Sequence, residues 1–262
     1  MRIFVTAFCA AAAALVTPAL AQPLERGAFA GSIAAGADFS VGGDVHGGAV
    51  APIADLGPLN PALAGVSAEL RIQARSFDEI YGEATQITLE GAYGLGSTRE
   101  AFFAVGRTQA DEGQVQVGGA FVPALSQTLP VLGRFDEFTA TSVEAGVRQY
   151  FGGEGALQPY VAGRVGAAFT DEIRATFTIP AAAIALNNVA FYDETTAFLI
   201  GADVGVSYAV AEGVSIGAEV GLRYTTGLED NDSAIGGLGL ARINDEGDRL
   251  SVPVLVRARF AF

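Results

Sequence analysis

The sequence contains one histidine, the side chain best suited to act as a general base near neutral pH. His46 lies within residues 42–48, which read Gly-Gly-Asp-Val-His-Gly-Gly, and Asp44 is the acid available to orient it. A general base must be held rigidly beside its substrate. A glycine-rich stretch instead predicts a solvated loop histidine, so we predict that the chain is not an enzyme.

The rest of the composition excludes several other kinds of chemistry. Cys9 is the one cysteine and lies in the apolar N-terminal stretch, so we predict neither a disulfide nor a cysteine metal site. We also predict no other metal site and no cofactor. The net charge of −14 and the pI of about 4.4 argue against a nucleic-acid partner, because phosphate binding requires clustered positive charge.

A set of acids and arginines is more informative, because its members share the polar face of segments in which polar and apolar residues alternate. Acids and arginines enclosed together can pair into a network that fills an interior. A wider interior would make the same charges a gated ion path. The predicted set is Glu69, Arg71, Arg75, Glu90, Glu144, Arg148, Arg164, Asp203, Glu219, Arg223, Arg257 and Arg259.

The alternation that positions these charges is the strand period of two residues. In residues 213–226, Val214, Val220 and Tyr224 fall on one face, whereas Glu219 falls on the other. Half of the residues are hydrophobic and mean hydropathy is +0.37, yet beyond the N-terminus no apolar run reaches the ~20 residues of a membrane helix. Eight alternating segments are found at 64–77, 83–95, 99–110, 139–151, 157–170, 196–209, 213–226 and 249–262.

The position of the glycines indicates which face is enclosed. Gly201, Gly205, Gly217 and Gly221 share the charged face, which suits a narrow lumen, whereas the other face carries large apolar and aromatic residues suited to lipid. The sequence therefore predicts an all-β fold, an antiparallel up-and-down transmembrane β-barrel of eight strands. A soluble lipid-carrying barrel would need an apolar interior instead.

Two further stretches leave the strand number open and define the predicted organisation of the chain. Adding 27–40 and 114–121 as strands would give ten. Residues 1–21 have the sequence pattern of a cleaved signal peptide. Residues 22–63 form a Gly/Pro-rich segment that is predicted to be an extra strand or a plug, and residues 64–262 are predicted to form the outer-membrane β-barrel.

The connections between segments alternate in length. Residues 96–98, 152–156 and 210–212 are short, as periplasmic turns are, whereas 111–138, 171–195 and 227–248 are long, as external loops are. The stretch 78–82 is an unusually short external loop in this scheme. The long connections are acidic, and although carboxylates suit Ca²⁺ or Mg²⁺ bridging to lipopolysaccharide, no EF-hand spacing is present and we expect solvated charge.

The chain resembles the small outer-membrane barrel family typified by the OmpA transmembrane domain. Residues 150–163, with Tyr150-Phe151, a glycine turn and Pro159-Tyr160, look like that family's fourth turn and strand, and residues 214–224 look like its seventh strand. The C-terminal Arg257-Ala258-Arg259-Phe260-Ala261-Phe262 looks like the signal read by the barrel assembly machinery. The resemblance covers residues 64–262 and implies Phe262 as the assembly signal, without a periplasmic peptidoglycan-binding domain.

Two functions remain open at this point. The first is a structural or surface-interaction protein of the Gram-negative outer membrane, exported through the periplasm, whose lumen is filled by Arg/acid pairs. The alternative is a small porin that passes ions or small solutes. The expected partners are outer-membrane lipid, lipopolysaccharide and the barrel assembly machinery, and the sequence does not identify an external partner.

Overall fold

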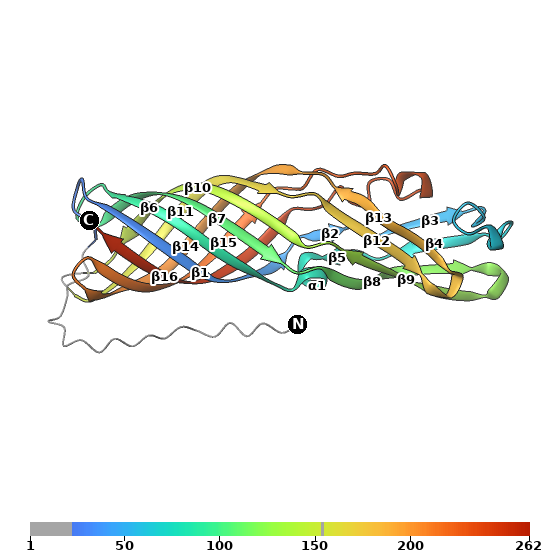
Figure 1. Cartoon of the computed structure of the whole chain (residues 1–262), viewed down its shortest axis with the longest axis horizontal. Helices are drawn as coiled ribbons and strands as arrows, with labels where there is room; N and C mark the ends of the chain where they lie inside the picture. Colours follow the sequence, from blue (N-terminus) through green and yellow to red (C-terminus); the bar gives the residue numbers. More distant parts are fainter. Residues whose placement is uncertain (1–22, 153–154) are drawn as a thin grey trace.

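The computed structural model describes residues 23–152 and 155–262, and eight of its strands form a closed antiparallel barrel (Figure 1). Each strand of the barrel is hydrogen-bonded to both of its neighbours, and β1 pairs with β16 to close it. The eight strands are β1 (Phe29–Gly42), β6 (Glu83–Gly94), β7 (Arg99–Ala110), β10 (Phe138–Tyr150), β11 (Leu157–Thr170), β14 (Thr195–Ala211), β15 (Val214–Thr225) and β16 (Arg249–Ala261).

The predicted fold class and the strand number of eight are confirmed, but the first predicted strand is wrong. Residues 64–77 lie outside the barrel, and β1 takes their place between β6 and β16. The barrel therefore begins at Phe29 and not at residue 64. Small residues on both faces of β1 give it little hydrophobic contrast, which explains the error. The stretch 114–121 is also outside the barrel, and the predicted signal sequence, 1–21, lies outside the described residues.

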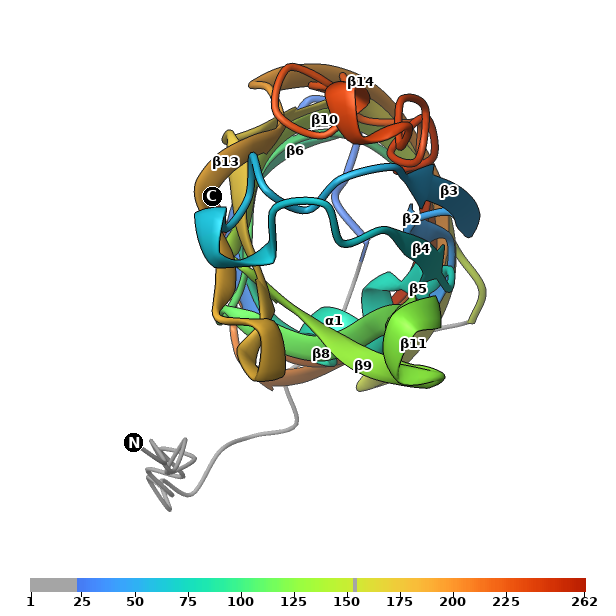
Figure 2. The ribbon, with the colours of Figure 1, turned by 90° about the vertical axis from the view of Figure 1, so that its right-hand side faces the viewer.

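The four long connections, 43–82, 111–137, 171–194 and 226–248, gather at one end of the barrel and form what we call the β extension (Figures 1 and 2). The expected short external loop at 78–82 is the end of the first of these. Six strands form one sheet in the order β13 (Ile184–Tyr192), β12 (Ile173–Ile179), β9 (Gln127–Phe135), β8 (Gly113–Val122), β4 (Ala68–Ile72) and β3 (Ala49–Ile53).

Smaller elements complete the β extension where it meets the barrel. β2 (Asp44–His46) pairs with β5 (Arg75–Ser76), which leads into the short helix α1 (Phe77–Tyr81). Four 3-10 turns lie in the long connections, η1 (Pro61–Leu63), η2 (Pro123–Leu125), η3 (Pro180–Ala182) and η4 (Gly236–Leu238).

Segment 226–248 lies between the two edge strands of this sheet. On one side Asp230 bridges to Tyr192 at the end of β13. On the other side Gly239 lies close to Ala51 of β3. Edge strands present unpaired backbone groups, and this segment covers part of both edges.

The polarity of the strands reverses between the barrel and the β extension. On the barrel, apolar side chains such as Val204 and Val256 are 60% and 67% exposed, whereas the interior holds charges. In the β extension the interior is a hydrophobic core that includes Leu70 and Ile173, and Glu69 and Arg71 lie at the surface. The reversal marks the edge of an apolar surrounding medium.

Aromatic side chains form two girdles around the barrel. Exposed rings near the β extension are Phe39, Phe169, Phe198 and Tyr224, and those near the short turns are Phe29, Tyr93, Phe151, Tyr208 and Phe260. In β14 Tyr208 lies ten positions after Phe198, which agrees with the ~9–11 residues a tilted strand needs to cross a bilayer. No helix among the described residues has the length and apolar character needed to cross a membrane.

We expect the Val204→Arg substitution to destabilise the folded protein in lipid vesicles by about 2–4 kcal/mol, because it places a charge near the centre of the apolar belt. The matched control is Val50→Arg in the β extension, where the valine is 68% exposed but faces water. Urea titration of vesicle-folded protein measures both effects. Equal losses of unfolding free energy in the two variants would show that the apolar belt around the barrel does not lie in the membrane.

Candidate functional site

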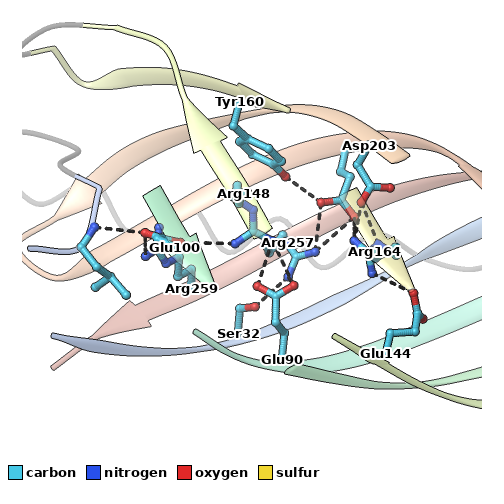
Figure 3. Close-up of polar contacts among 12 residues, drawn as sticks. Ser32, Glu90, Glu100, Glu144, Arg148, Tyr160, Arg164, Asp203, Arg257 and Arg259 are labelled. Atoms are coloured by element: carbon cyan, nitrogen blue, oxygen red, sulfur yellow. Dashed lines mark hydrogen bonds and ion pairs between the residues drawn. The ribbon is translucent and has the colours of Figure 1, made fainter. Parts of the chain in front are cut away.

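The barrel interior holds a connected network of buried ion pairs, shown in Figure 3. Strand alternation turns every second residue inward, so each barrel strand except β1 contributes an acid or an arginine to it. Five acids and five arginines take part, all buried: Glu90, Glu100, Glu144, Asp203, Glu219, Arg148, Arg164, Arg223, Arg257 and Arg259.

The turn-side half of the network is centred on Glu90 and Glu100. An Nη2 group of Arg148 donates to both Glu90 oxygens at 2.9 Å, and its Nη1 lies 3.4 Å from Glu100. Arg259 pairs with Glu100 from the side of the turns. Glu100 also accepts a hydrogen bond from the backbone N–H of Leu24 at 3.0 Å, which ties the start of the described chain into the lumen.

The remaining half of the network continues towards the β extension. Arg257 joins the two halves, since it lies 3.1 Å from Glu90 and 3.0 Å from Glu219. Arg164 pairs with Asp203 and lies 3.3 Å from Glu144. Each buried charge therefore has an opposite charge beside it, as a low-dielectric interior requires.

Arg223 and a separate pair extend the ionic interior. Arg223 pairs with Asp203 at 2.6 Å and lies 3.8 Å from Glu144. Nearer the β extension, Arg249 pairs with Asp38 at 2.8 Å. Charges of opposite sign thus occur in equal number among these buried groups, six of each.

Aromatic rings and glycines pack the space between the charges. The Arg148 guanidinium lies 5.0 Å from the ring centre of Phe102 and 4.9 Å from that of Tyr160, within the range of a cation–π contact. A Cβ atom placed on Gly201 would lie only 2.6 Å from Cδ of Arg223. The lumen is therefore too narrow for larger side chains at this glycine, in line with the sequence-based argument.

The structure brings together nine of the twelve charged residues predicted for the lumen, and three lie elsewhere. Glu69 and Arg71 pair with each other at 2.6 Å on the surface of the β extension. Arg75 pairs with Glu79 of α1 at 2.8 Å. These three placements were wrong because 64–77 is not a barrel strand.

Sequence reasoning missed three lumen charges: Glu100, Asp38 and Arg249. Asp38 was missed because β1 was left out of the barrel. Glu100 could have been found, since it is in phase with Phe102 and Ala104 on the buried face of β7.

His46 is buried, so its prediction as a solvated loop residue is wrong. It is 2% exposed, and its ring stacks on Phe135 with centroids 5.9 Å apart. Burial lowers its pKa, Arg75 adds to that effect, and the Gly47 carbonyl and Asp44 oppose it. The glycines beside it let the backbone approach segment 226–248 closely, since a Cβ atom on Gly43 would clash with the Asp248 carbonyl oxygen, and they do not make the segment a free loop.

The acidic long connections bring no three metal-binding side chains together in the part of the chain that the structure describes. Some of their acids hydrogen-bond within the protein. Asp232, for example, accepts from the backbone N–H of Arg242.

A closed antiparallel barrel with an apolar outer belt, two aromatic girdles and an ionic interior is an outer-membrane β-barrel protein. No protein-family model matches the sequence, and no curated protein is significantly similar to it.

Several solved structures are similar in fold. Neisserial surface protein A is 16% identical, with 89% of this chain and 97% of that chain covered and a TM-score of 0.40. Ail of Yersinia pestis, solved with the heparin analogue sucrose octasulfate, is 10% identical, with 91% and 100% covered and a TM-score of 0.39. The protease OmpT from Escherichia coli is 7% identical, with 94% and 99% covered and a TM-score of 0.40. The fold class of this chain rests on its own strand pairing.

We expect Glu219→Ala to destabilise the barrel by about 3–5 kcal/mol, because it leaves Arg257 without one of its two buried partners. The control is Glu69→Ala, which breaks an exposed pair worth about 0–1 kcal/mol. Urea unfolding of the protein in detergent compares them. Because Arg257 keeps its contact with Glu90, we expect a loss of stability near the lower end of this range. Equal unfolding midpoints for the two variants would show that the network does not contribute to stability.

We also expect His46 to make stability depend on pH. Its folded-state pKa lies below the ordinary value of 6.5, so the unfolded chain takes up the proton more readily. Protonation of His46 therefore favours the unfolded state and lowers the free energy of unfolding. This loss of stability is absent well above pH 6.5 and grows as the pH falls through 6.5 towards the folded-state pKa. The wild type should lose more stability between pH 8 and pH 5 than His46→Phe does, and parallel losses in urea unfolding would show that His46 does not titrate in this way.

Proposed function

We propose that this protein is a non-conducting barrel of the Gram-negative outer membrane that holds the β extension outside the cell as an interaction surface. The observation that carries the proposal is the continuous series of ion pairs along the lumen, from Arg259 at the turn side to Arg223 nearer the β extension. Eight strands enclose little more space than their own side chains fill, so water and ions have no continuous path.

The direction of the barrel supports a surface role. The short turns lie at one end and the β extension at the other (Figure 1), and short turns face the periplasm in barrels of this kind. Interaction would then use the polar outer face of the β extension, and surrounding lipopolysaccharide would contact its base. The proposal includes no catalysis, because aromatic rings enclose His46.

Assembly belongs to the same proposal. The chain would be exported through the periplasm and inserted by the barrel assembly machinery, with Phe262 as the recognised residue. The Phe262 side chain is 85% exposed, and its N–H donates to the Phe29 carbonyl at 2.8 Å, across the seam where the barrel closes.

One observation favours a small porin as the second candidate. A cavity of about 500 Å³ opens at the turn side, lined by residues that include Leu24, Tyr150 and Arg259. It would be the vestibule of a pore if the Arg259–Glu100 pair opened.

Conductance in planar bilayers separates the two functions. The wild type should show no steady conductance, whereas the double variant Glu90→Ala/Arg257→Ala, which removes one charge of each sign from the centre of the network, should conduct. The control, Glu69→Ala/Arg71→Ala, removes a surface pair and should stay closed. Large steady conductance of the wild type would replace the proposal with the porin.

A further inference from the structure

A shallow groove of about 410 Å³ lies on the outward face of the barrel, where β1, β6 and β7 are neighbours. Eight residues line it, and the hydroxyl of Tyr93 is the one polar side-chain atom among them. Phe29 and Tyr93, which belong to the girdle near the short turns, border the groove with ring centroids 5.0 Å apart, and Phe103 of β7 borders it with 54% of its surface exposed. The groove is therefore part of the apolar belt and opens towards the membrane.

Gly91 of β6 hollows the surface at this place. In the strand register it lies between Gly31 of β1 and Phe103 of β7. A Cβ atom placed on Gly91 would meet no atom within 4 Å, and its φ is not positive, so neither the packing nor the backbone conformation of the protein requires a glycine here. Because glycine weakens the interior of a strand, such a position often marks the close approach of another molecule. The hollow at Gly91 thus fits a contact from the membrane side.

A cation lies beside the groove at the level of the membrane surface. Arg99 faces outward on β7, two residues before Ala101, and Ala101 pairs across the strands with the girdle residue Tyr93. Two residues of a strand span ~7 Å, which places Arg99 on the turn side of the girdle, where lipid headgroups lie. Its Nε donates to Oε1 of Gln149 at 2.6 Å, and its two Nη groups have no partner among the described residues. The guanidinium is therefore held in place with donors available to an anion.

We propose that the groove binds one phospholipid of the periplasmic leaflet, with an acyl chain over Gly91 and the phosphate paired with Arg99. Arginine suits this partner because its planar fork of donors matches the oxygens of a phosphate. The choice of leaflet rests on the proposed orientation, in which the short turns face the periplasm, whereas the site does not depend on whether the lumen conducts. A second copy docked on the same face about a two-fold axis would set hollow against hollow and bring like charges near each other.

Native mass spectrometry of the full protein in detergent micelles measures this binding directly. Dioleoylphosphatidylglycerol should bind saturably, with one molecule per barrel. Dioleoylglycerol, which has the same chains but no phosphate, should bind about threefold to fivefold more weakly, as expected for the loss of one exposed ion pair. Equal affinity for the two lipids would overturn the proposal, as would tighter binding of lipid A, which belongs to the external leaflet.

Two variants with matched controls locate the lipid. Gly91→Leu fills the groove and should weaken the binding of both lipids about tenfold, the loss of roughly two buried methylene groups. Its control is Gly163→Leu on β11, an outward glycine outside the groove that likewise has no atom within 4 Å of an added Cβ. Arg99→Gln should remove the preference for the phospholipid, whereas Arg107→Gln, at the other end of β7, should preserve it. Unchanged binding in Gly91→Leu, or equal effects in a variant and its control, would overturn the site.

Phe103→Ala gives a second test of the groove, because it removes a bordering side chain without adding volume. It should also weaken the binding of both lipids, and unchanged affinity in this variant would overturn the proposal. A wild-type dimer that Gly91→Leu converts into a monomer would identify a second copy as the occupant instead of a lipid. None of these measurements involves conductance, so a failure of the lipid site and a failure of the closed barrel are told apart.

Discussion

The antiparallel pairing of β1 with β16 is the constraint on which the other features depend. Within a bilayer no water satisfies backbone N–H and C=O groups, so a sheet can cross it only when its first and last strands meet. The pairing runs from Ala30 with Ala261 to Gly42 with Leu250. It sets the strand number at eight, and that number sets the width of the interior.

The narrow interior explains the chemistry inside it. Charges enclosed at this width lose their hydration and remain ionised only beside opposite charges, which accounts for the balanced set of acids and arginines. Arginine suits this role because its planar guanidinium donates several hydrogen bonds at fixed angles. Arg148 reaches both oxygens of Glu90 and also Glu100, and the sequence contains no lysine.

Beyond the membrane the same strand period serves the opposite polarity. Water surrounds the β extension, so its apolar residues turn inward and form the core that includes Phe135, Phe191 and Ile173. This core is built from four separate connections, and it encloses His46. The barrel and the β extension thus meet where the preferred direction of apolar side chains changes.

The sequence by itself determined most of the barrel, because strands between lipid and an ionic lumen must alternate sharply. Residues 213–226 show both faces clearly. The residues alone therefore predicted that this segment is a strand, that its apolar face points outward and that Glu219 points into the lumen. Alternation also showed residues 64–77 as a strand segment, but it carries no information about which sheet a strand joins. Only the tertiary structure placed β1 in the barrel and Glu69 and Arg71 on the β extension, because strand pairing between distant residues decides which side faces water. The burial of His46 was decided in the same way, since residues from four long connections enclose a stretch whose glycines alone indicated a loop.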